Sequence, residues 1–279
     1  MRRLAAAVLL IGAGTLGAQI KNLKPGFNFF SPQQDVQMGK EAKAQVEKQM
    51  PVLHDAKVTN YLTGLGHRLA QSPHAGDWPF SFEAIADKNI NAFALPGGPI
   101  FVNTATITSA DNEAQLAGVL AHEMSHVVLR HGTHEVSKQN IIQLPAMLAG
   151  SVMGNGIWGR LGQLGVNLAA NSMILKYSRD AESQADYNGA LIMADAGYNP
   201  VEMARFFEKL EAQGGGNSKL TQFLSDHPNP GNRVKAVEEE IQYMPQKKYS
   251  DSITGQFPQI KNYVSRLPAP PPPKQQPTQ

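Results

Sequence analysis

Apolar and polar positions recur along this chain with two different periods. In residues 33–50 and 54–71 the apolar side chains recur every three or four positions, a pattern typical of amphipathic helices. The segment "FSFEAIA" (residues 80–86) predicts a strand. The segment "NAFALPGGPIFVNT" (residues 91–104) predicts two short strands around a Pro-Gly-Gly turn, with Pro99 in an outer strand because proline has no N–H to donate to a sheet.

Helices dominate the rest of the pattern. An apolar helix follows the hairpin, and we expect Ser109 or Asp111 to cap its N-terminus and Gly132 to end it. Another helix is predicted to start near Ser178 and run to Gly197, and the segment "FLSDHPNPGNRVKAVEEEIQ" is expected to end in the last helix. Helices, a small sheet and then more helices predict an α+β fold rather than an alternating parallel one.

The two ends of the chain differ in composition from the middle. The opening "MRRLAAAVLLIGAGTLGAQ" has two arginines, an apolar run and small residues, which predicts a signal peptide over residues 1–18 with cleavage after Ala18. A short membrane anchor is the alternative. The proline-rich residues 267–279 predict a disordered tail. Residues 19–266 remain for one domain, and nothing within them predicts a transmembrane span in the mature chain.

Charge and cysteine content narrow the function classes. Two of the 25 basic residues, Arg2 and Arg3, lie in the predicted signal peptide, so 23 basic residues face 23 acidic ones in the mature chain. This neutral balance gives no indication of a nucleic-acid partner. The chain has no cysteine, which excludes disulfides, and export without cysteine predicts the periplasm or the cell envelope.

The segment "VLAHEMSHVVLRHG" (residues 119–132) places three polar groups in an apolar helix. His122 and His126 are four residues apart, so both side chains project from one helix face and can bind one zinc ion. Glu123 lies beside that face, where it can take a proton from a water molecule at the metal. Unpaired histidine and glutamate in a protein core would cost several kcal/mol, a cost that a metal removes. The alternative is that both histidines are structural.

A catalytic zinc ion needs a third protein ligand. The metzincin pattern does not supply it, because this chain has Gly132 where that pattern has histidine. His131 and His134 lie on another side of the helix or beyond its end. The segment "SRDAESQADYNG" offers Glu182 and Asp186, one helical turn apart. One carboxylate would bind the metal and the other would accept the outer N–H of a ligand histidine; a solvated acidic helix start is the alternative.

The order of these motifs resembles one family of metallopeptidases. His-Glu-x-x-His is followed about 56 residues later by Glu-x-x-x-Asp, as in the HtpX and CAAX-prenyl-protease family of gluzincin zinc metallopeptidases. The likeness covers most of residues 33–245 and includes "NAFALPGGPIFVNT", "RDAESQADYNG" and "HPNPGNRV". It is closest to the soluble, exported BepA-like branch, without the C-terminal helical repeats of that branch. The resemblance implies a helix-rich zinc peptidase domain with a small sheet and an edge hairpin.

The resemblance also implies roles for single residues. It implies His122, His126 and Glu182 as ligands of one zinc ion per chain. Glu123 would be the catalytic base, and Asp186 would support the site from behind its ligands.

Three further positions near the motifs have open roles. Arg179, one turn before Glu182, would fix that carboxylate or bind substrate, or would form only a surface salt bridge. Relatives have a histidine near the metal where this chain has His227. That histidine would stabilise the oxyanion or close the fourth coordination position in a latent state, or it would be only a turn residue. Arg233, in the same segment, is a further candidate for a functional role near the metal.

The hairpin suggests how a peptide would bind. An extended substrate can pair with the outer strand at Asn91, Ala92, Phe93 and Ala94, through main-chain hydrogen bonds that demand little of its sequence. A purely structural hairpin is the alternative. The apolar, glycine-rich residues 141–172 would form a lid over the groove, or a loop without that function.

These features predict a zinc metalloendopeptidase that cleaves unfolded or misassembled cell-envelope proteins, with the outer-membrane assembly machinery as a candidate partner. Two alternatives remain open. One is a zinc-binding chaperone or assembly factor that holds clients without cleaving them, and the other is a zinc amidase for a non-peptide envelope substrate. The intact Glu123 favours hydrolysis, because holding a client needs no base.

Overall fold

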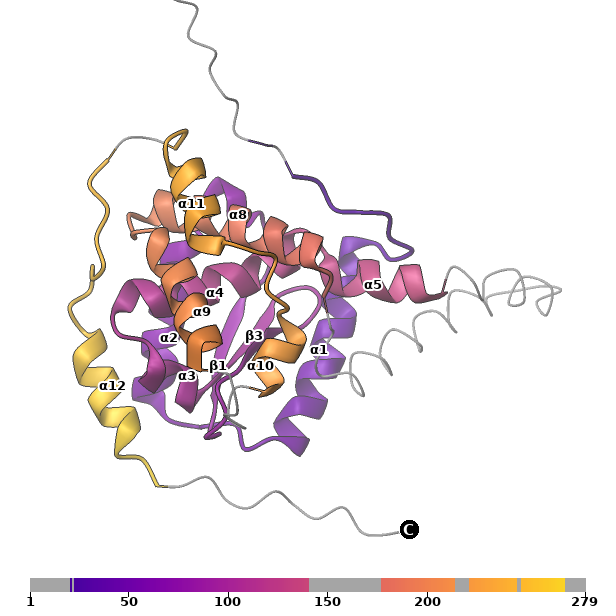
Figure 1. Ribbon diagram of the computed structural model, residues 1–279. Helices are drawn as coiled ribbons and strands as arrows, with labels where there is room; N and C mark the ends of the chain where they lie inside the picture. Colours follow the sequence, from indigo (N-terminus) through magenta and orange to yellow (C-terminus); the bar gives the residue numbers. More distant parts are fainter. Residues whose placement is uncertain (1–20, 22, 141–176, 214–220, 245–246, 269–279) are drawn as a thin grey trace, which may run out of the picture.

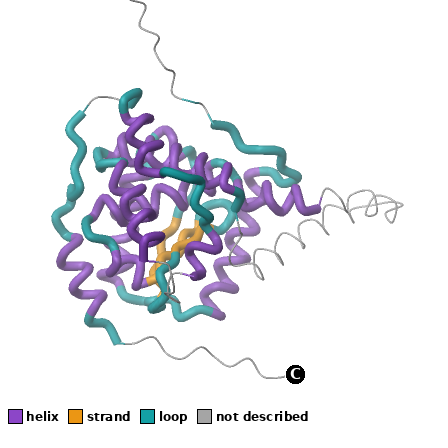
Figure 2. The backbone as a smooth tube through the Cα atoms, viewed as in Figure 1, coloured by secondary structure: helices purple, strands orange, loops and turns teal. Residues whose placement is uncertain are grey.

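The computed structural model describes residues 21, 23–140, 177–213, 221–244 and 247–268 (Figure 1). Helices surround a small sheet, in the α+β arrangement that the sequence predicts (Figure 2). The described elements are α1 (Pro32–Gln49), α2 (Ala56–Leu69), the 3₁₀-helix η1 (Pro73–Ala75), β1 (Ser81–Ile85), β2 (Ala92–Ala94), β3 (Pro99–Asn103), α3 (Thr104–Ser109), α4 (Glu113–Val128), α5 (His131–Asn140), α8 (Arg179–Ala196), α9 (Val201–Gln213), α10 (Thr221–Asp226), α11 (Arg233–Ile241) and α12 (Phe257–Ser265).

The sheet has the strand order β1-β3-β2, with β3 parallel to β1 and antiparallel to β2. The predicted hairpin is therefore present, but β3 is the central strand and the placement of Pro99 in an outer strand is wrong. Pro99 is tolerated because it is the first residue of β3, and its carbonyl accepts the Leu95 N–H at 2.8 Å. The outer edge of β1 pairs with Leu53, whose N–H donates to Ala84 at 2.8 Å. No described strand pairs with the outer edge of β2.

The two faces of the sheet pack against different helices, because side chains alternate along each strand. Phe93 and Phe101 stack with ring centroids 5.3 Å apart and form a small core with Ala42 and Val46 of α1. The opposite face belongs to the main core, together with α2 and α4. α4 lies at the centre of that core and contacts α2, α8 and α9 as well as β2 and β3.

Local signals set the ends of the long helices. Ser31 caps α1 through a capping box with Gln34, and the Asp55 side chain caps α2. The helix predicted between Ser178 and Gly197 is confirmed as α8. Ser178 caps its start, and Gly197 ends it with a left-handed φ of 87°.

The start of α4 differs from the prediction. Ser109 ends the short helix α3, and α4 is capped by Asn112 rather than by Ser109 or Asp111. The Asn112 side chain accepts the Gln115 N–H at 2.9 Å. Asp111 instead pairs with Lys209 of α9 at 2.7 Å. Neighbouring polar residues can each act as a cap, and tertiary packing selects one of them.

The end of α4 also differs from the prediction. The helix ends at Val128 and α5 starts at His131, so Gly132 lies in the first turn of α5 and is not the stop. Arg130 makes the break with a left-handed φ of 55°, the one such value at a described residue other than glycine. A largely buried ion pair holds this conformation, since the Arg130 guanidinium donates to Asp35 of α1 at 2.7 and 3.1 Å.

Three predicted segments lie outside the described residues: the signal peptide (1–18), the glycine-rich stretch (141–172) and the tail, apart from Leu267 and Pro268. The segment predicted to contain the last helix does contain α11, but α12 follows it and packs against α2 and α3. None of the described helices has the length and apolar composition that a membrane crossing requires.

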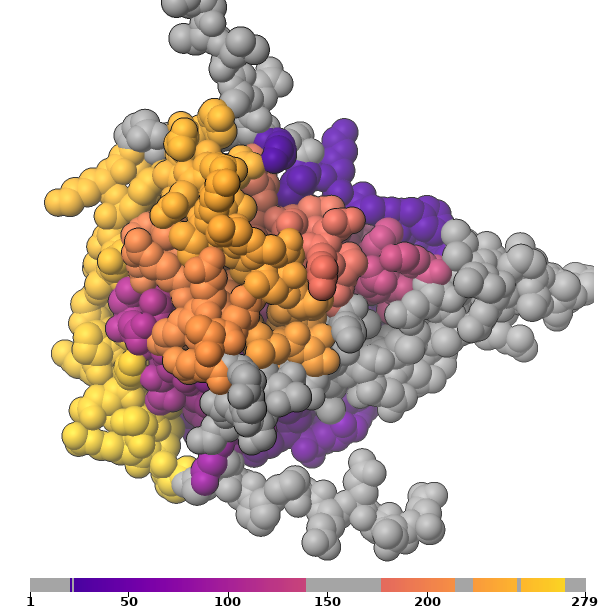
Figure 3. All heavy atoms as spheres, in the orientation of Figure 1, coloured from indigo at the N-terminus to yellow at the C-terminus, as the bar shows by residue number. Residues whose placement is uncertain are grey.

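One buried carboxylate holds the C-terminal part of the chain to the start of α4. Glu113 is fully buried and accepts hydrogen bonds from the Ile253 and Thr254 N–H groups at 3.0 and 2.9 Å. The Tyr198 hydroxyl donates to it at 2.7 Å, and the Tyr61 and Thr254 hydroxyls also contact it. These bonds fix the loop before α12, which belongs to the yellow segment along one side of the molecule in Figure 3. Burial raises the pKa of Glu113, but the hydrogen bonds hold it below its usual value.

We expect Glu113→Gln to lower the free energy of unfolding by about 3 kcal/mol, because the amide nitrogen cannot accept these bonds. The folded state depresses the pKa of Glu113 below its ordinary value of 4.5. The stabilisation is therefore complete above that value and is lost as the pH falls through the folded-state pKa. Urea unfolding at neutral and acidic pH measures a difference between wild type and variant that shrinks in acid.

The matched control is Glu238→Gln, at an exposed position of α11. We expect it to change the stability by less than about 0.5 kcal/mol at every pH. A Glu113→Gln variant that unfolds like this control would show that the carboxylate does not hold the C-terminal segment in place.

Candidate metal centre and active site

The packing of α8 against α4 builds the site. It is the most extensive helix contact in the described structure. Gly189 of α8 allows the close approach, because a Cβ atom at this position would lie 3.3 Å from the His122 backbone nitrogen and 3.1 Å from the Met203 sulfur. The two carboxylates of α8, Glu182 and Asp186, thereby lie next to the histidines of α4.

Four side chains converge in the core: His122, His126, Glu182 and His227. None is more than 2% exposed, and one donor atom from each lies within 4.8 Å of the others. His122 Nε2 is 3.0 Å from His126 Nε2 and 3.3 Å from a Glu182 oxygen. His227 follows α10, and its Nδ1 lies 3.2 Å from Glu182 and 3.3 Å from His122 Nε2. The structure thus brings together three predicted ligands and the predicted fourth histidine.

Asp186 and Arg233 contact the ligands from the side of α8 and α11. Asp186 Oδ1 lies 3.0 Å from His122 Nδ1, where it can accept the outer N–H of that histidine. Arg233 donates to Glu182 at 3.0 Å and lies 3.4 Å from Asp186. Arg179 is exposed at the start of α8, so Arg233 holds the position next to Glu182 that was considered for Arg179. A role for Arg179 in substrate binding stays a prediction.

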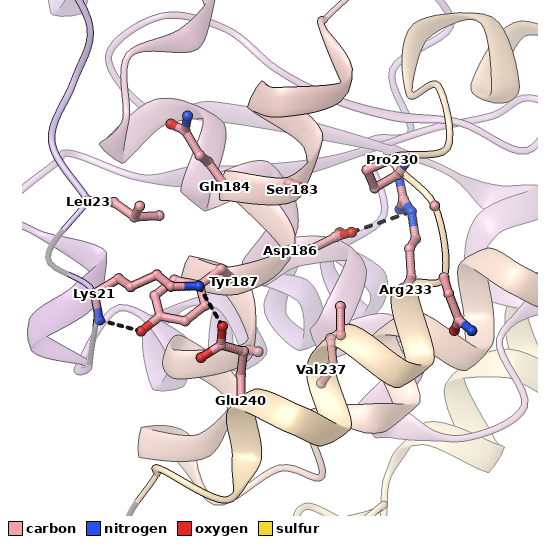
Figure 4. A pocket seen from close by; sticks show the side chains of 14 residues that line it. Lys21, Leu23, Ser183, Gln184, Asp186, Tyr187, Pro230, Arg233, Val237 and Glu240 are labelled. Atoms are coloured by element: carbon pink, nitrogen blue, oxygen red, sulfur yellow. Dashed lines mark hydrogen bonds and ion pairs between the residues drawn. The ribbon is translucent and has the colours of Figure 1, made fainter. Parts of the chain in front are cut away.

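A cavity of about 340 Å³ adjoins these supporting residues (Figure 4). Asp186 and Arg233 line one part of it, and Lys21 and Tyr187 line another. The Lys21 ammonium pairs with Glu240 at 2.8 Å. The lining includes none of the four converging side chains, so the cavity borders the residues that orient the ligands rather than the site itself.

Glu123 projects from α4 into the same buried space. It is 1% exposed, and in the described part of the chain neither carboxylate oxygen has a hydrogen-bond partner. His227 Nε2 lies 3.5 Å from one of these oxygens. Burial raises the pKa of Glu123, while the charges of His227 and His122 and, to a smaller extent, the Ala94 N–H of β2 oppose this effect. A buried acidic group is suited to exchanging a proton with a bound molecule.

Burial acts to lower the pKa of both His122 and His126, but the outcomes are opposite. For His122 the carboxylates of Glu182 and Asp186 outweigh burial and raise the pKa to about 10. For His126 burial prevails, reinforced by positive charge on His122, and the pKa lies well below its usual value. Burial raises the pKa of Glu182, but the charges of His227 and His122 hold it well below its usual range. The carboxylate of Glu182 is therefore ionised, as a metal ligand requires.

Sequence reasoning missed two neighbours of His126. His131 Nδ1 lies 3.0 Å from His126 Nδ1, and the Tyr177 ring stacks on the His126 ring with centroids 3.9 Å apart. The spacing of a continuous helix puts His131 on another side, but the break at Arg130 returns it to His126. Nothing in the sequence around Tyr177 indicates its position.

The outer edge of β2 presents its main chain in one register. β2 bonds to β3 at Asn91 and Leu95, so by alternation Phe93 also pairs inward, and the N–H groups of Ala92 and Ala94 point away from β3. The Ala92 N–H is accepted by the Asn91 side chain at 3.0 Å. The two outward N–H groups therefore differ, because only that of Ala92 has a side-chain acceptor on the adjacent residue.

Several known proteins are similar in sequence to this chain over most of its length. Peptidase family M48 matches residues 56–241. The chain is 30% identical to the beta-barrel assembly-enhancing protease of Yersinia pestis over 249 residues, which is 83% of this chain and 51% of that protein. It is 31% identical to the beta-barrel assembly-enhancing protease of Escherichia coli (strain K12) over 207 residues, or 72% and 42% of the two chains. It is 27% identical to the mitochondrial metalloendopeptidase OMA1 of Schizosaccharomyces pombe over 243 residues, or 85% and 70%.

The matched region contains the whole candidate site. Residues 56–241 include α4, α8 and the position of His227, and thus all four converging side chains. The chain spans about half the length of the beta-barrel assembly-enhancing proteases that it matches. The resemblance inferred from the sequence motifs is confirmed, and this chain belongs to peptidase family M48.

Proposed function

We propose that this protein is a zinc-dependent metalloendopeptidase. The buried group of His122, His126 and Glu182, with the unpartnered carboxylate of Glu123 beside it, is the observation that supports this function most directly. A zinc chaperone would need the ligands but would have no use for a buried carboxylate that accepts no hydrogen bond. Relatives named as proteases and metalloendopeptidases support the same reaction.

The donor set fits zinc. Imidazole nitrogens and a carboxylate oxygen are the ligands of catalytic zinc sites, and one zinc ion per chain would draw them together. His122 Nε2 and His126 Nε2 lie 3.0 Å apart, and both face the Glu182 carboxylate, so one ion could be bound by all three side chains. Bound zinc would supply Lewis-acid activation of water and of the scissile carbonyl.

The chain's own residues move the protons and fix the geometry. Glu123 takes a proton from the attacking water and later passes it to the leaving amine. Asp186 holds the tautomer of His122 through its contact with Nδ1, and Arg233 holds one oxygen of Glu182. The ligands therefore need little rearrangement during the reaction.

His227 closes the site in this conformation. Its Nδ1 faces the ligand atoms of His122 and Glu182, and its Nε2 faces Glu123. These contacts support a resting state in which His227 fills the fourth coordination position. A displaced His227 would remain close enough to stabilise the oxyanion of the reaction.

The substrate binds as an added strand on β2. The Ala94 N–H points away from β3 and lies near Glu123, so an extended peptide paired there would pass the base. Main-chain pairing demands little sequence preference, which suits unfolded or misassembled proteins as substrates.

The cellular role is protein quality control in the periplasm or cell envelope. The predicted signal peptide (1–18) would export the chain, and relatives named for enhancing beta-barrel assembly support outer-membrane assembly machinery as a partner. The sequence identity of about 30% supports the shared chemistry more strongly than a shared partner.

We expect the purified protein to contain about one zinc ion per chain. His122→Ala and Glu182→Ala each remove a ligand and should strongly lower the zinc content in metal analysis. His227→Ala leaves three ligands and should keep most of the zinc. His67→Ala, at an exposed position of α2, is the control. Full zinc retention by Glu182→Ala would show that the ligand assignment is wrong.

Glu123→Gln keeps the shape of the side chain but removes proton transfer. It should retain zinc and lower the turnover of an unfolded substrate such as casein about 100-fold or more. Cleavage at the wild-type rate by a zinc-loaded variant would rule out Glu123 as the base.

Proline at position 94 removes the outward N–H of β2 without adding charge. Ala94→Pro should lower kcat/KM for a peptide about fivefold, the effect of one lost hydrogen bond, with zinc content unchanged. Ala92→Pro should change kcat/KM less, because the Asn91 side chain already accepts that N–H. Phe93→Pro breaks the pairing with β3 and should lower the melting temperature. Equal catalytic losses at positions 92 and 94 would argue against strand addition at Ala94.

A further inference from the structure

We infer that His131 is a positioning residue for the metal ligand His126, and that Gln184 fixes His131 in turn. The inference rests on the proposed role of His126 as a zinc ligand. It concerns a histidine that lies outside the His-Glu-x-x-His motif and outside the group of four converging donors.

The break after α4 creates this contact. Residues 126 and 131 are five positions apart and would point in different directions on a continuous helix. Because α4 ends at Val128 and Arg130 is left-handed, the chain turns and the His131 ring faces the His126 ring. The ring centroids are 5.0 Å apart with an interplanar angle of 71°, and the two Nδ1 atoms are 3.0 Å apart. His131 is 5% exposed, so water does not compete for this bond.

The donor and acceptor roles follow from the ligand role of His126. Its Nε2 faces Glu182 and His122, so this nitrogen must be unprotonated to bind a metal and the proton must be on Nδ1. The Nδ1–H of His126 then donates to Nδ1 of His131. The proton of His131 is consequently on Nε2, which faces the Gln184 side-chain oxygen at 3.4 Å. Every nitrogen in this chain of contacts has one consistent role.

The two ligand histidines of α4 are held in different ways. His122 has a carboxylate, Asp186, at its outer nitrogen, whereas His126 has an imidazole. A neutral acceptor adds less negative charge to the ligand than a carboxylate does, so the main effect of His131 is on ring orientation. Tyr177 stacks on the face of His126 and restricts its tilt, while the bond to His131 restricts rotation about the ring axis.

Gln184 connects this arrangement to the third ligand. It lies on α8, two residues after Glu182, and its side-chain oxygen faces His131 on α5. The orientation of a ligand on α4 is thereby tied to the helix that supplies the carboxylate ligand. The Arg130–Asp35 ion pair also helps to position His131, because it holds the turn that directly precedes this residue.

Three substitutions test the inference. His131→Phe keeps a ring of similar size but removes the acceptor, and it should weaken zinc binding about 10- to 100-fold. His131→Asn places a side-chain oxygen where Nδ1 lies and should recover most of the affinity. Gln184→Leu should weaken binding in the same direction by a smaller factor. Zinc affinity is measured by competition with a chromophoric chelator, and the absorption spectrum of the cobalt-substituted protein reports the ligand geometry.

His134→Phe is the matched control, because His134 lies on the same helix but its side chain is directed to the N-terminal segment, where its Nδ1 hydrogen-bonds the Phe27 carbonyl at 2.7 Å. It should leave the zinc affinity and the cobalt spectrum unchanged. Thermal melting of the metal-free proteins verifies folding, and if His131→Phe does not fold, Gln184→Leu alone decides.

A His131→Phe variant with the zinc affinity and cobalt spectrum of the wild type would overturn the inference. Equal loss of zinc affinity in His131→Phe and His131→Asn would also overturn it, because the loss would then come from ring volume rather than from the acceptor. Wild-type affinity in Gln184→Leu would overturn the role of Gln184. Absence of zinc binding by the wild type would instead overturn the proposed function itself, and this inference with it.

Discussion

The contact between α4 and α8 is the constraint on which the rest of the structure depends. It brings two histidines and a glutamate from one helix against two carboxylates from the other, in a core where none of them is more than 6% exposed. Unpaired, such groups would each cost several kcal/mol, so the packing is tolerable only if the charges and donors match across the interface. Gly189 sets the spacing at which they match. The surrounding helices, the sheet and the hydrogen bonds of Glu113 at the start of α4 hold this helix at that spacing.

A second constraint is the left-handed turn at Arg130. A residue other than glycine in this conformation costs about 1 kcal/mol, and the buried bonds to Asp35 offset that cost. The turn ends α4 two residues after His126 and returns His131 to the candidate site. An ion pair with α1, far from the ligands in sequence, therefore determines which side chain lies behind one of them.

Much of this arrangement could be predicted from the sequence, and the rest could not for physical reasons. The period of apolar positions located α1, α2, α4 and α8, and the spacing of His122 and His126 together with the carboxylates of α8 located the candidate site. The central position of Pro99 was not predictable, because strand order depends on which segment pairs with β1. The caps of α4 and the contact of Arg233 with Glu182 depend on packing between distant segments. His131 was missed because periodicity assumes an unbroken helix.

The same contacts connect the outer edge of β2 to the fourth donor. The Asn91 side chain accepts the Ala92 N–H, and its amide reaches Asp226 at 3.5 Å. Asp226 directly precedes His227, and its carbonyl accepts the Tyr177 N–H at 3.3 Å. A peptide that paired with β2 would compete with the Asn91 side chain for the Ala92 N–H. The same Asn91 side chain contacts Asp226, the residue before His227. Strand addition and displacement of that histidine would disturb one connected set of hydrogen bonds, so in the proposed enzyme the closed site and the substrate edge are parts of a single arrangement.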